Sequence, residues 1–271
     1  MTFEMKYHIT TRYLSKPSKR RSGLPMLPGV KFVVAHDTGN PNSTAAQNVA
    51  YFERSRDEMS ASAHLFVDDQ EIIECIPAVE DAIPEKAWHV LYKVEADNQL
   101  FGFNANDAAI GVEYCYGDRI TADEAYNKFV WVIAYICYKF DLDPASKVVG
   151  HFFLDPQRKT DPVTGLAHSR RTYEQLLRDI ASEYRACTGA APSAPAEPHV
   201  YESGTVRAMV KLNIRTVAPN TRAAVHQTVP PGTRLEYCLV ARNGEPINGN
   251  PVWYGDSNGH FFWSGGVVKS V

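Results

Sequence analysis

Two histidines and one aspartate have the residue types and spacing expected of a metal site that also holds a water molecule. His36 ends the apolar run Phe32–Ala35. His151 follows a second short run, Lys147–Gly150, and Asp161 comes ten residues later. Ligands are usually held where the strands of an α/β sheet end, so His36 can join the other two from an adjacent strand. Two nitrogens, one carboxylate oxygen and an open position for water form the ligand set of catalytic Zn²⁺.

One glutamate and one lysine fall where such a site needs a base and a cation. Glu113 is the only charged residue in the apolar run Ala109–Cys115, and it would accept a proton from the water. Lys159 stands two residues before Asp161, so its ammonium could face the oxyanion that forms when water attacks a carbonyl. Taken singly, each of these residues is as well explained by a solvated or a core position. Only the combination favours a site.

The segments that must position these residues alternate between strand-like and helix-like patterns over residues 1–187. Apolar runs predict strands at 32–36, 64–67, 72–76, 109–115 and 147–150. Three capping boxes, in which a threonine is followed three residues later by glutamine or glutamate, predict helices that begin after Thr44, Thr121 and Thr172. We therefore expect an α/β fold, a mixed β-sheet flanked by helices.

The composition changes at residues 188–199, where alanine and proline predominate and few side chains can be buried. This segment is interpreted as a linker between a first domain, 1–187, and a second, 200–271. A chain of 271 residues is long enough for two domains. After the linker, short strand candidates are broken by turns such as Asn248–Gly249 and Asn258–Gly259, which predicts a small all-β barrel.

Composition and charge exclude several classes of protein. With 44% hydrophobic and 22% charged residues, the chain is ordinary globular protein, not a disordered, collagen-like or coiled-coil one. Its net charge of -3 gives no basic excess that would indicate nucleic acid or an anionic membrane as a partner. The five cysteines are odd in number and include no CxxC pair, so we expect thiols that neither form disulfides nor bind metal.

The sequence shows neither a membrane span nor a secretory signal. No stretch approaches the roughly 18 apolar residues of a membrane span. Residues 1–24 contain no apolar run of the length found in a signal peptide. We therefore expect the protein to be made and first retained in the cytoplasm.

Six separated motifs occur in an order that resembles one enzyme family. They are VVAHDTGN at 33–40, SAHLFVD at 62–68, AWH at 87–89, IGVE at 110–113, GH at 150–151 and KTDP at 159–162. Over roughly residues 25–185 the chain resembles the zinc N-acetylmuramoyl-L-alanine amidases of the type-2 group, which are related to bacteriophage T7 lysozyme and to peptidoglycan recognition proteins. It is most similar to the cell-wall lytic enzymes, or endolysins, of phages and prophages of Gram-positive bacteria.

The resemblance implies a role for each residue of the candidate site. It implies Zn²⁺ ligands at His36, His151 and Asp161, the catalytic glutamate at Glu113 and a transition-state stabiliser at Lys159. The third ligand is cysteine in some relatives and aspartate in others, so Asp161 lies within the family's range. Some branches have histidine at the position of Lys159, which leaves the role of this lysine less well defined.

Three further residues in the motifs are candidates for a substrate groove. His64 and His89 match histidines that line the groove or support the site, and neither is expected to be a ligand. Trp88 is interpreted either as the floor of a groove for the glycan or as a buried structural side chain.

The resemblance implies a peptidoglycan hydrolase that uses zinc-activated water. It would cleave the amide bond between N-acetylmuramic acid and the first L-alanine of the stem peptide. Bacterial peptidoglycan is then the expected partner, and a monomer is the expected state. The lack of a signal peptide fits an endolysin that waits in the host cytoplasm until a separate pore lets it reach the wall. Two other functions remain open: a non-catalytic peptidoglycan-binding protein on the same scaffold, and a peptidase that cuts within the stem peptide.

The tail resembles a bacterial SH3 (SH3b) domain, a module that binds cell walls. The similarity rests on LNIR at 212–215, PGT at 231–233, Tyr237 and WY at 253–254. Residues 200–271 hold seven Lys or Arg and four Asp or Glu, a balance of +3, so residues 1–199 carry -6. A mildly basic module suits an anionic wall. At least half of the aromatic residues Trp253, Tyr254, Phe262 and Trp263 are expected in the barrel core, and a purely structural or dimerising tail is the alternative.

Overall fold

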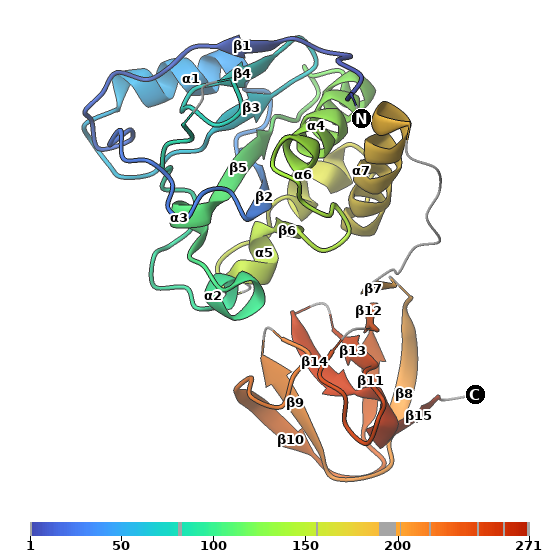
Figure 1. Cartoon of the computed structure of the whole chain (residues 1–271). Helices are drawn as coiled ribbons and strands as arrows, with labels where there is room; N and C mark the ends of the chain where they lie inside the picture. Colours follow the sequence, from blue (N-terminus) through green and yellow to red (C-terminus); the bar gives the residue numbers. More distant parts are fainter. Residues whose placement is uncertain are drawn as a thin grey trace. The chain divides into compact units, whose positions relative to one another are not determined.

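The computed structural model divides the chain into two compact units, Met1–Ser193 and Ala194–Val271. It describes residues 2–80, 83–155, 157–189, 199–200, 202–216, 218–242, 244–256 and 258–269. Most of the predicted linker, residues 190–198, lies outside the described residues. Figure 1 shows both units.

The larger unit is built on a six-stranded mixed sheet (Figure 1). From edge to edge the order is β1 (Ile9–Thr11), β4 (Ile72–Glu74), β3 (Leu65–Val67), β5 (Ala109–Tyr114), β2 (Phe32–Asp37) and β6 (Val148–Gly150). The strands β3 and β4 pair antiparallel as a hairpin, and the other neighbouring pairs are parallel. Parallel strands that are covered on both faces consist of continuous apolar runs, and all six residues of β2 are buried.

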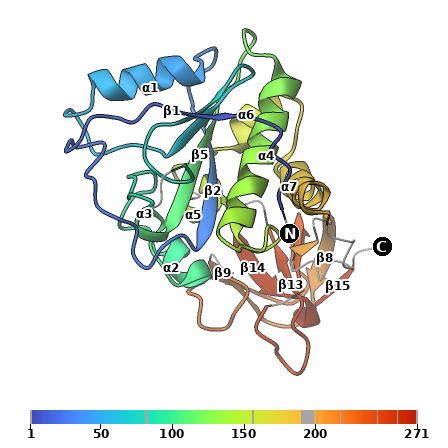
Figure 2. The ribbon, with the colours of Figure 1, turned by 45° about the horizontal axis from the view of Figure 1, so that its top comes forward.

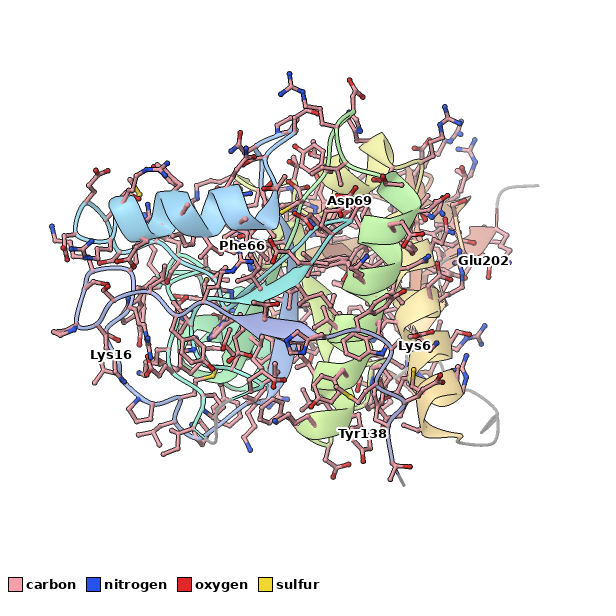
Figure 3. The ribbon with its side chains drawn as sticks, turned by 90° about the horizontal axis from the view of Figure 1, so that it is seen from above. Lys6, Lys16, Phe66, Asp69, Tyr138 and Glu202 are labelled. Atoms are coloured by element: carbon pink, nitrogen blue, oxygen red, sulfur yellow. The ribbon has the colours of Figure 1, made fainter. Side chains whose placement is uncertain are left out.

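One face of the sheet is covered by α1 (Ala45–Arg54). Phe66 of β3 lies opposite Glu113 of β5 in the ladder, so the two side chains project from the same face. The ring centroid of Phe66 lies 5.0 Å from that of Phe52 in α1, and Figure 3 shows Phe66 beside this helix. Glu113 therefore projects toward the α1 side of the sheet.

The other face is covered by α4 (Ala122–Lys139), which packs against α7 (Tyr173–Thr188; Figure 2). Tyr114 projects to this side, and its ring centroid lies 5.1 Å from that of Phe129 in α4. The unit also contains the short helices α2 (Ala96–Phe101), α3 (Ala105–Ala108), α5 (His151–Leu154) and α6 (Val163–His168). The predicted fold, a mixed β-sheet flanked by helices, is confirmed.

The helices α1, α4 and α7 begin after the three predicted threonines, but the predicted capping box is absent at α4. At α1 the capping box is complete, because Thr44 and Gln47 each accept a hydrogen bond from the other's backbone N–H. At α4 the side chain of Thr121 makes no cap hydrogen bond. Its backbone N–H donates instead to Asp69, which belongs to the turn between β3 and β4. The start of α4 is thus fixed by a tertiary contact.

The smaller unit consists of antiparallel strands in two sheets. The first has the order β10 (Val225–Val229), β9 (Leu212–Thr216), β14 (His260–Trp263), β13 (Trp253–Gly255), β12 (Leu239–Ala241) and β7 (His199–Val200). The second has the order β11 (Arg234–Tyr237), β8 (Gly204–Ala208) and β15 (Val267–Lys269). Trp253 and Phe262 are buried, whereas Tyr254 and Trp263 are partly exposed. The prediction of an all-β tail is confirmed.

The core of the larger unit consists mainly of apolar side chains. Trp131 of α4 is fully buried, and Cys75, Cys115 and Cys137 are buried thiols outside any disulfide. Among the helices that the structure describes, none combines the length and the apolar character of a membrane span.

His64, a candidate for lining a substrate groove or supporting the site, is a core residue. It immediately precedes β3 and is fully buried. Its Nε2 donates to the carbonyl of Glu85 at 2.9 Å, and its Nδ1 accepts the backbone N–H of Gly111 at 3.0 Å. A neutral imidazole has one donor and one acceptor, so the ring is fully satisfied. Burial lowers the pKa of His64 to about 4.

The free energy of unfolding is expected to fall as the pH decreases from about 6.5 to about 4, because His64 takes up a proton on unfolding. Its pKa is lower in the folded state, so the unfolded chain binds more protons in this window and stability is greatest above it. One such group contributes up to about 1.4 kcal/mol per pH unit. Urea unfolding at several pH values measures this, and His64→Asn, which keeps an acceptor for Gly111, should give a shallower pH dependence. Equal slopes for the two proteins would contradict the expectation.

Candidate active site

The strands β2, β5 and β6 end at the same edge of the larger sheet, the one formed by the carboxyl ends of its parallel strands. In the parallel ladder, His36 of β2 lies opposite Glu113 of β5. On the other side of β2, Ala35 lies opposite Gly150, the last residue of β6, so His151 comes next to His36. Parallel strands place their carboxyl ends on the same edge of a sheet, and β2 and β5 lie side by side in Figures 1 and 2. One edge therefore carries all three side chains.

The three predicted metal ligands converge at this edge. Oδ2 of Asp161 lies 2.9 Å from Nδ1 of His36 and 2.9 Å from Nδ1 of His151. Both imidazoles are buried and Asp161 is partly exposed. The backbone N–H of Phe152 donates to the carbonyl of Asp161 at 3.0 Å, which holds the aspartate beside the first turn of α5. The chain thus returns to the start of α5 at Asp161, ten positions after His151.

Burial and mutual contact set the charges of this cluster. Burial first, and the neighbouring His151 second, lower the pKa of His36 to about 4, so this ring is neutral at pH 7. Burial alone would raise the pKa of Asp161, but its contacts with the two imidazoles outweigh burial and hold this pKa well below its usual range. Carboxylate and neutral imidazole are the protonation states in which these groups bind metal ions.

The side chain of Glu113 stands in the same site. Its Oε2 is buried and has no hydrogen-bond partner among the described residues. Burial raises the pKa of Glu113 well above its usual value, and the carboxylates of Asp161 and Asp37 add to this effect. The ammonium of Lys159 acts in the opposite direction and forms no ion pair with any described residue. The carboxylate of Glu113 and the ammonium of Lys159 therefore line the same cavity as the cluster.

The donor set of the cluster suits Zn²⁺. Bonds from zinc to nitrogen and oxygen are about 2.0–2.2 Å, which places the ligand atoms of a tetrahedral site roughly 3.3 Å apart. One ligand atom from each of His36, His151 and Asp161 lies within 4.8 Å of the other two. Three protein ligands are the number found in catalytic zinc sites. No thiol is part of this cluster in the described part of the chain.

A cavity of about 560 Å³ surrounds the cluster. Its wall contains every predicted site residue except His64, namely His36, Trp88, His89, Glu113, His151, Lys159 and Asp161. Tyr51, Phe52 and Met59 line it on the side of α1, and Thr164 of α6 also contributes. Volumes of about 300–1,000 Å³ are typical of sites for small molecules or segments of polymers.

Trp88 and His89 reach the cavity from the loop between β4 and α2. Trp88 is partly exposed, and its backbone forms two hydrogen bonds with Ser62, of 3.0 and 3.1 Å. His89 is buried, with Nε2 at 3.1 Å from the carbonyl of Ala109 and Nδ1 at 3.0 Å from Nε2 of His36. His89 therefore contacts a predicted ligand directly.

Arg20 is among the residues of the cavity wall that were not predicted from the sequence. Arg20 is almost completely buried, and its guanidinium lies 4.3 Å from the ring centroid of Phe52 in α1. It donates hydrogen bonds to Ser55, after the end of α1, and to the carbonyl of Ala61. Six Lys or Arg residues lie among the first 24, and nothing in their pattern distinguishes Arg20 and Arg21, which are buried.

Comparisons with known proteins identify relatives of this chain. N-acetylmuramoyl-L-alanine amidase BlyA of Bacillus subtilis strain 168 is 33% identical over 172 residues, which are 60% of this chain and 44% of that protein. The chain thus spans less than half the length of this relative.

Two solved structures have a similar fold. Staphylococcus aureus hydrolase AmiA, solved in complex with its ligand, gives a TM-score of 0.55 at 24% identity and covers 70% of this chain and 90% of its own. A mutant endolysin from Bacillus subtilis gives a TM-score of 0.50 at 22% identity and covers 64% and 99%. At these identities the likeness shows the fold alone. The model of the family described as N-acetylmuramoyl-L-alanine amidase matches residues 26–164, about half of the chain, and the chain therefore belongs to this family.

Proposed function

We propose that the protein is a zinc-dependent peptidoglycan hydrolase that cleaves the amide bond between N-acetylmuramic acid and the first L-alanine of the stem peptide. The observation that carries the proposal is the convergence of His36, His151 and Asp161 beside the unpartnered carboxylate of Glu113. The family to which the chain belongs supports the choice of bond.

His36, His151 and Asp161 would hold the metal ion. When bound, Zn²⁺ acts as a Lewis acid on a substrate carbonyl and lowers the pKa of a coordinated water. The protein supplies three ligands on a rigid sheet edge, two of which are buried imidazoles. This leaves the further coordination position that a catalytic zinc site requires.

Glu113 would act as the general base and then as the general acid. Its carboxylate would take a proton from the attacking water and pass it to the leaving amine of L-alanine. A general base works best when its pKa is close to the working pH, and burial raises the pKa of Glu113 in that direction. The same burial stabilises the neutral acid, so Glu113 would hold the proton until it passes to the amide nitrogen as the C–N bond breaks.

Lys159 would stabilise the tetrahedral oxyanion. Its side chain lines the cavity that holds Glu113, and it is partly exposed, so it can turn toward a substrate. Preorganised cations of this kind act most strongly where charge develops during the reaction. Trp88, with Tyr51 and Met59 on the α1 side, gives the cavity an apolar wall on which a sugar ring could stack.

We also propose the boundaries of the functional domains. The enzyme would occupy residues 1–187, a linker residues 188–199 and an SH3-like wall-binding module residues 200–271. The two antiparallel sheets and the balance of +3 charges in the tail support this division. As an endolysin, the protein would reach the wall through a separate pore and act there as a monomer.

Replacing Glu113 by glutamine should reduce hydrolysis by a factor of about 10² to 10⁴, because the amide cannot accept the proton of the water. Purified walls are digested with each protein, and the products are identified by mass spectrometry. Wild type should release whole stem peptides with free L-alanine amino groups and leave intact glycan. Chelation of the metal should abolish this release.

Three results would contradict the assignment. Cleavage inside the stem peptide would indicate a peptidase, and new reducing sugar ends would indicate a glycosidase. Tight binding of walls without any product would indicate a non-catalytic binding protein. The far-ultraviolet circular dichroism of Glu113→Gln should match that of the wild type, because this substitution changes neither the size nor the shape of the side chain.

Removal of the tail provides a separate test of the module. A chain that ends at Gly189 should lose most of its binding to sedimented walls and should still cleave short soluble muropeptides. Sedimentation at several salt concentrations measures this, since attraction between a basic module and an anionic wall weakens with salt. Unchanged wall binding by the shortened chain would favour a structural or dimerising tail.

A further inference from the structure

We propose that His89 is a positioning residue that holds His36 in the one tautomer able to present Nδ1 to a metal ion. The inference rests on the proposed metal site and adds to it a function for a histidine that is not itself a ligand. It follows from a series of hydrogen bonds in which the role of each atom is fixed by the next.

The series begins at a main-chain carbonyl. Nε2 of His89 lies 3.1 Å from the carbonyl oxygen of Ala109. A carbonyl only accepts hydrogen bonds, so Nε2 of His89 carries a hydrogen. In a neutral imidazole the other nitrogen then has none, and Nδ1 of His89 must be an acceptor. It lies 3.0 Å from Nε2 of His36, which is therefore the donor.

The ring of His89 is kept neutral by its surroundings. It is buried, and its two described hydrogen-bond partners are a carbonyl and an imidazole, neither of which carries a negative charge. A buried cation without an adjacent anion is unfavourable, so the acceptor role of Nδ1 holds at neutral pH.

These hydrogen bonds determine whether Nδ1 of His36 carries a hydrogen. Since Nε2 of His36 carries the hydrogen, its Nδ1 presents a lone pair. That lone pair lies 2.9 Å from Oδ2 of Asp161, and the oxygens of a carboxylate also offer only lone pairs. Two acceptors at this distance repel each other unless a cation lies between them. The arrangement is thus prepared for a metal ion before the ion arrives.

The position of His89 is itself tightly constrained. A Cβ atom on Gly111 would lie 2.7 Å from both Cγ and Nδ1 of His89, so only glycine lets the ring lie against β5. The side chain of Asn106 accepts hydrogen bonds from the backbone of His89 and Val90, at 2.9 and 3.0 Å. It donates back to the carbonyl of Val90 at 2.7 Å. Loop, ring and strand are therefore fixed together.

Two substitutions of similar polarity separate the roles of the two ring nitrogens. The amide oxygen of asparagine can occupy the place of Nδ1, whereas the amide of glutamine reaches the place of Nε2. His89→Asn keeps an acceptor for His36, and His89→Gln keeps only the contact with Ala109. His89→Leu removes both.

The dissociation constant for Zn²⁺ is measured on the full chain by competition with a chromogenic chelator. His89→Gln and His89→Leu should bind zinc about 10- to 100-fold more weakly than the wild type, and His89→Asn should stay close to it. His64→Asn serves as the matched control, because His64 is an equally buried imidazole that bonds only to the main chain. It should lower stability and leave the dissociation constant unchanged.

A second measurement locates the hydrogen on His36 directly. Nitrogen-15 NMR of metal-free wild type should show the hydrogen of His36 on Nε2, and the same should hold for His89→Asn but not for His89→Gln. A hydrogen on Nδ1 of His36 in the wild type, or wild-type zinc affinity in folded His89→Gln, would overturn the inference. Absence of zinc binding by the wild type would instead refute the proposed metal site, so the two failures can be told apart.

Discussion

The parallel register between β2 and β5 is the constraint on which the site depends. It places His36 directly opposite Glu113, with both side chains on the α1 face. A slip of one residue would turn the position of Glu113 toward α4, where Tyr114 now packs on Phe129. The apolar residues that precede His36 and Glu113 in these two strands therefore fix the site as firmly as they fix the core. The chemistry is positioned by the same ladder that buries the apolar side chains.

The site is assembled at a cost in stability that the surrounding fold must offset. An unpartnered buried carboxylate and a lone pair directed at another acceptor are each unfavourable by about 1–3 kcal/mol. Such groups persist only where neighbouring structure leaves them no alternative. Here the strands β2 and β5, the first turn of α5 and the loop of His89 leave little freedom for adjustment. Binding of a metal ion and of substrate would relieve both conflicts.

Much of the larger unit could be predicted from the sequence because its signals are local. Continuous apolar runs identified five strands, and threonine-based boxes identified the starts of three helices. The helices α2, α3, α5 and α6 were not predicted, since segments of four to six residues are too short to show a helical periodicity. The strand β1, Ile-Thr-Thr, was not predicted because it contains no apolar run. Thr121 shows a further limit, because its N–H is taken by Asp69 from a distant turn.

The same contrast between local signals and tertiary contacts explains which residues of the candidate site could be predicted. Motif order identified the residues that converge, but it could not separate His64 from His89, which are both buried histidines beside β5. Only the partners differ: one ring bonds solely to the main chain and the other reaches His36. Arg20 gave no signal at all, because burial of a charged side chain follows from tertiary packing rather than from spacing.

The burial of Arg20 has a consequence for how this enzyme unit can be divided and recombined. The family match starts at residue 26, yet the wall of the cavity near Phe52 and Ala61 is held by a guanidinium that precedes it. A fragment cut at the edges of the match would also lose β1 and α7. The smallest portion that can be joined to another module therefore begins well before the first motif and ends well after the last.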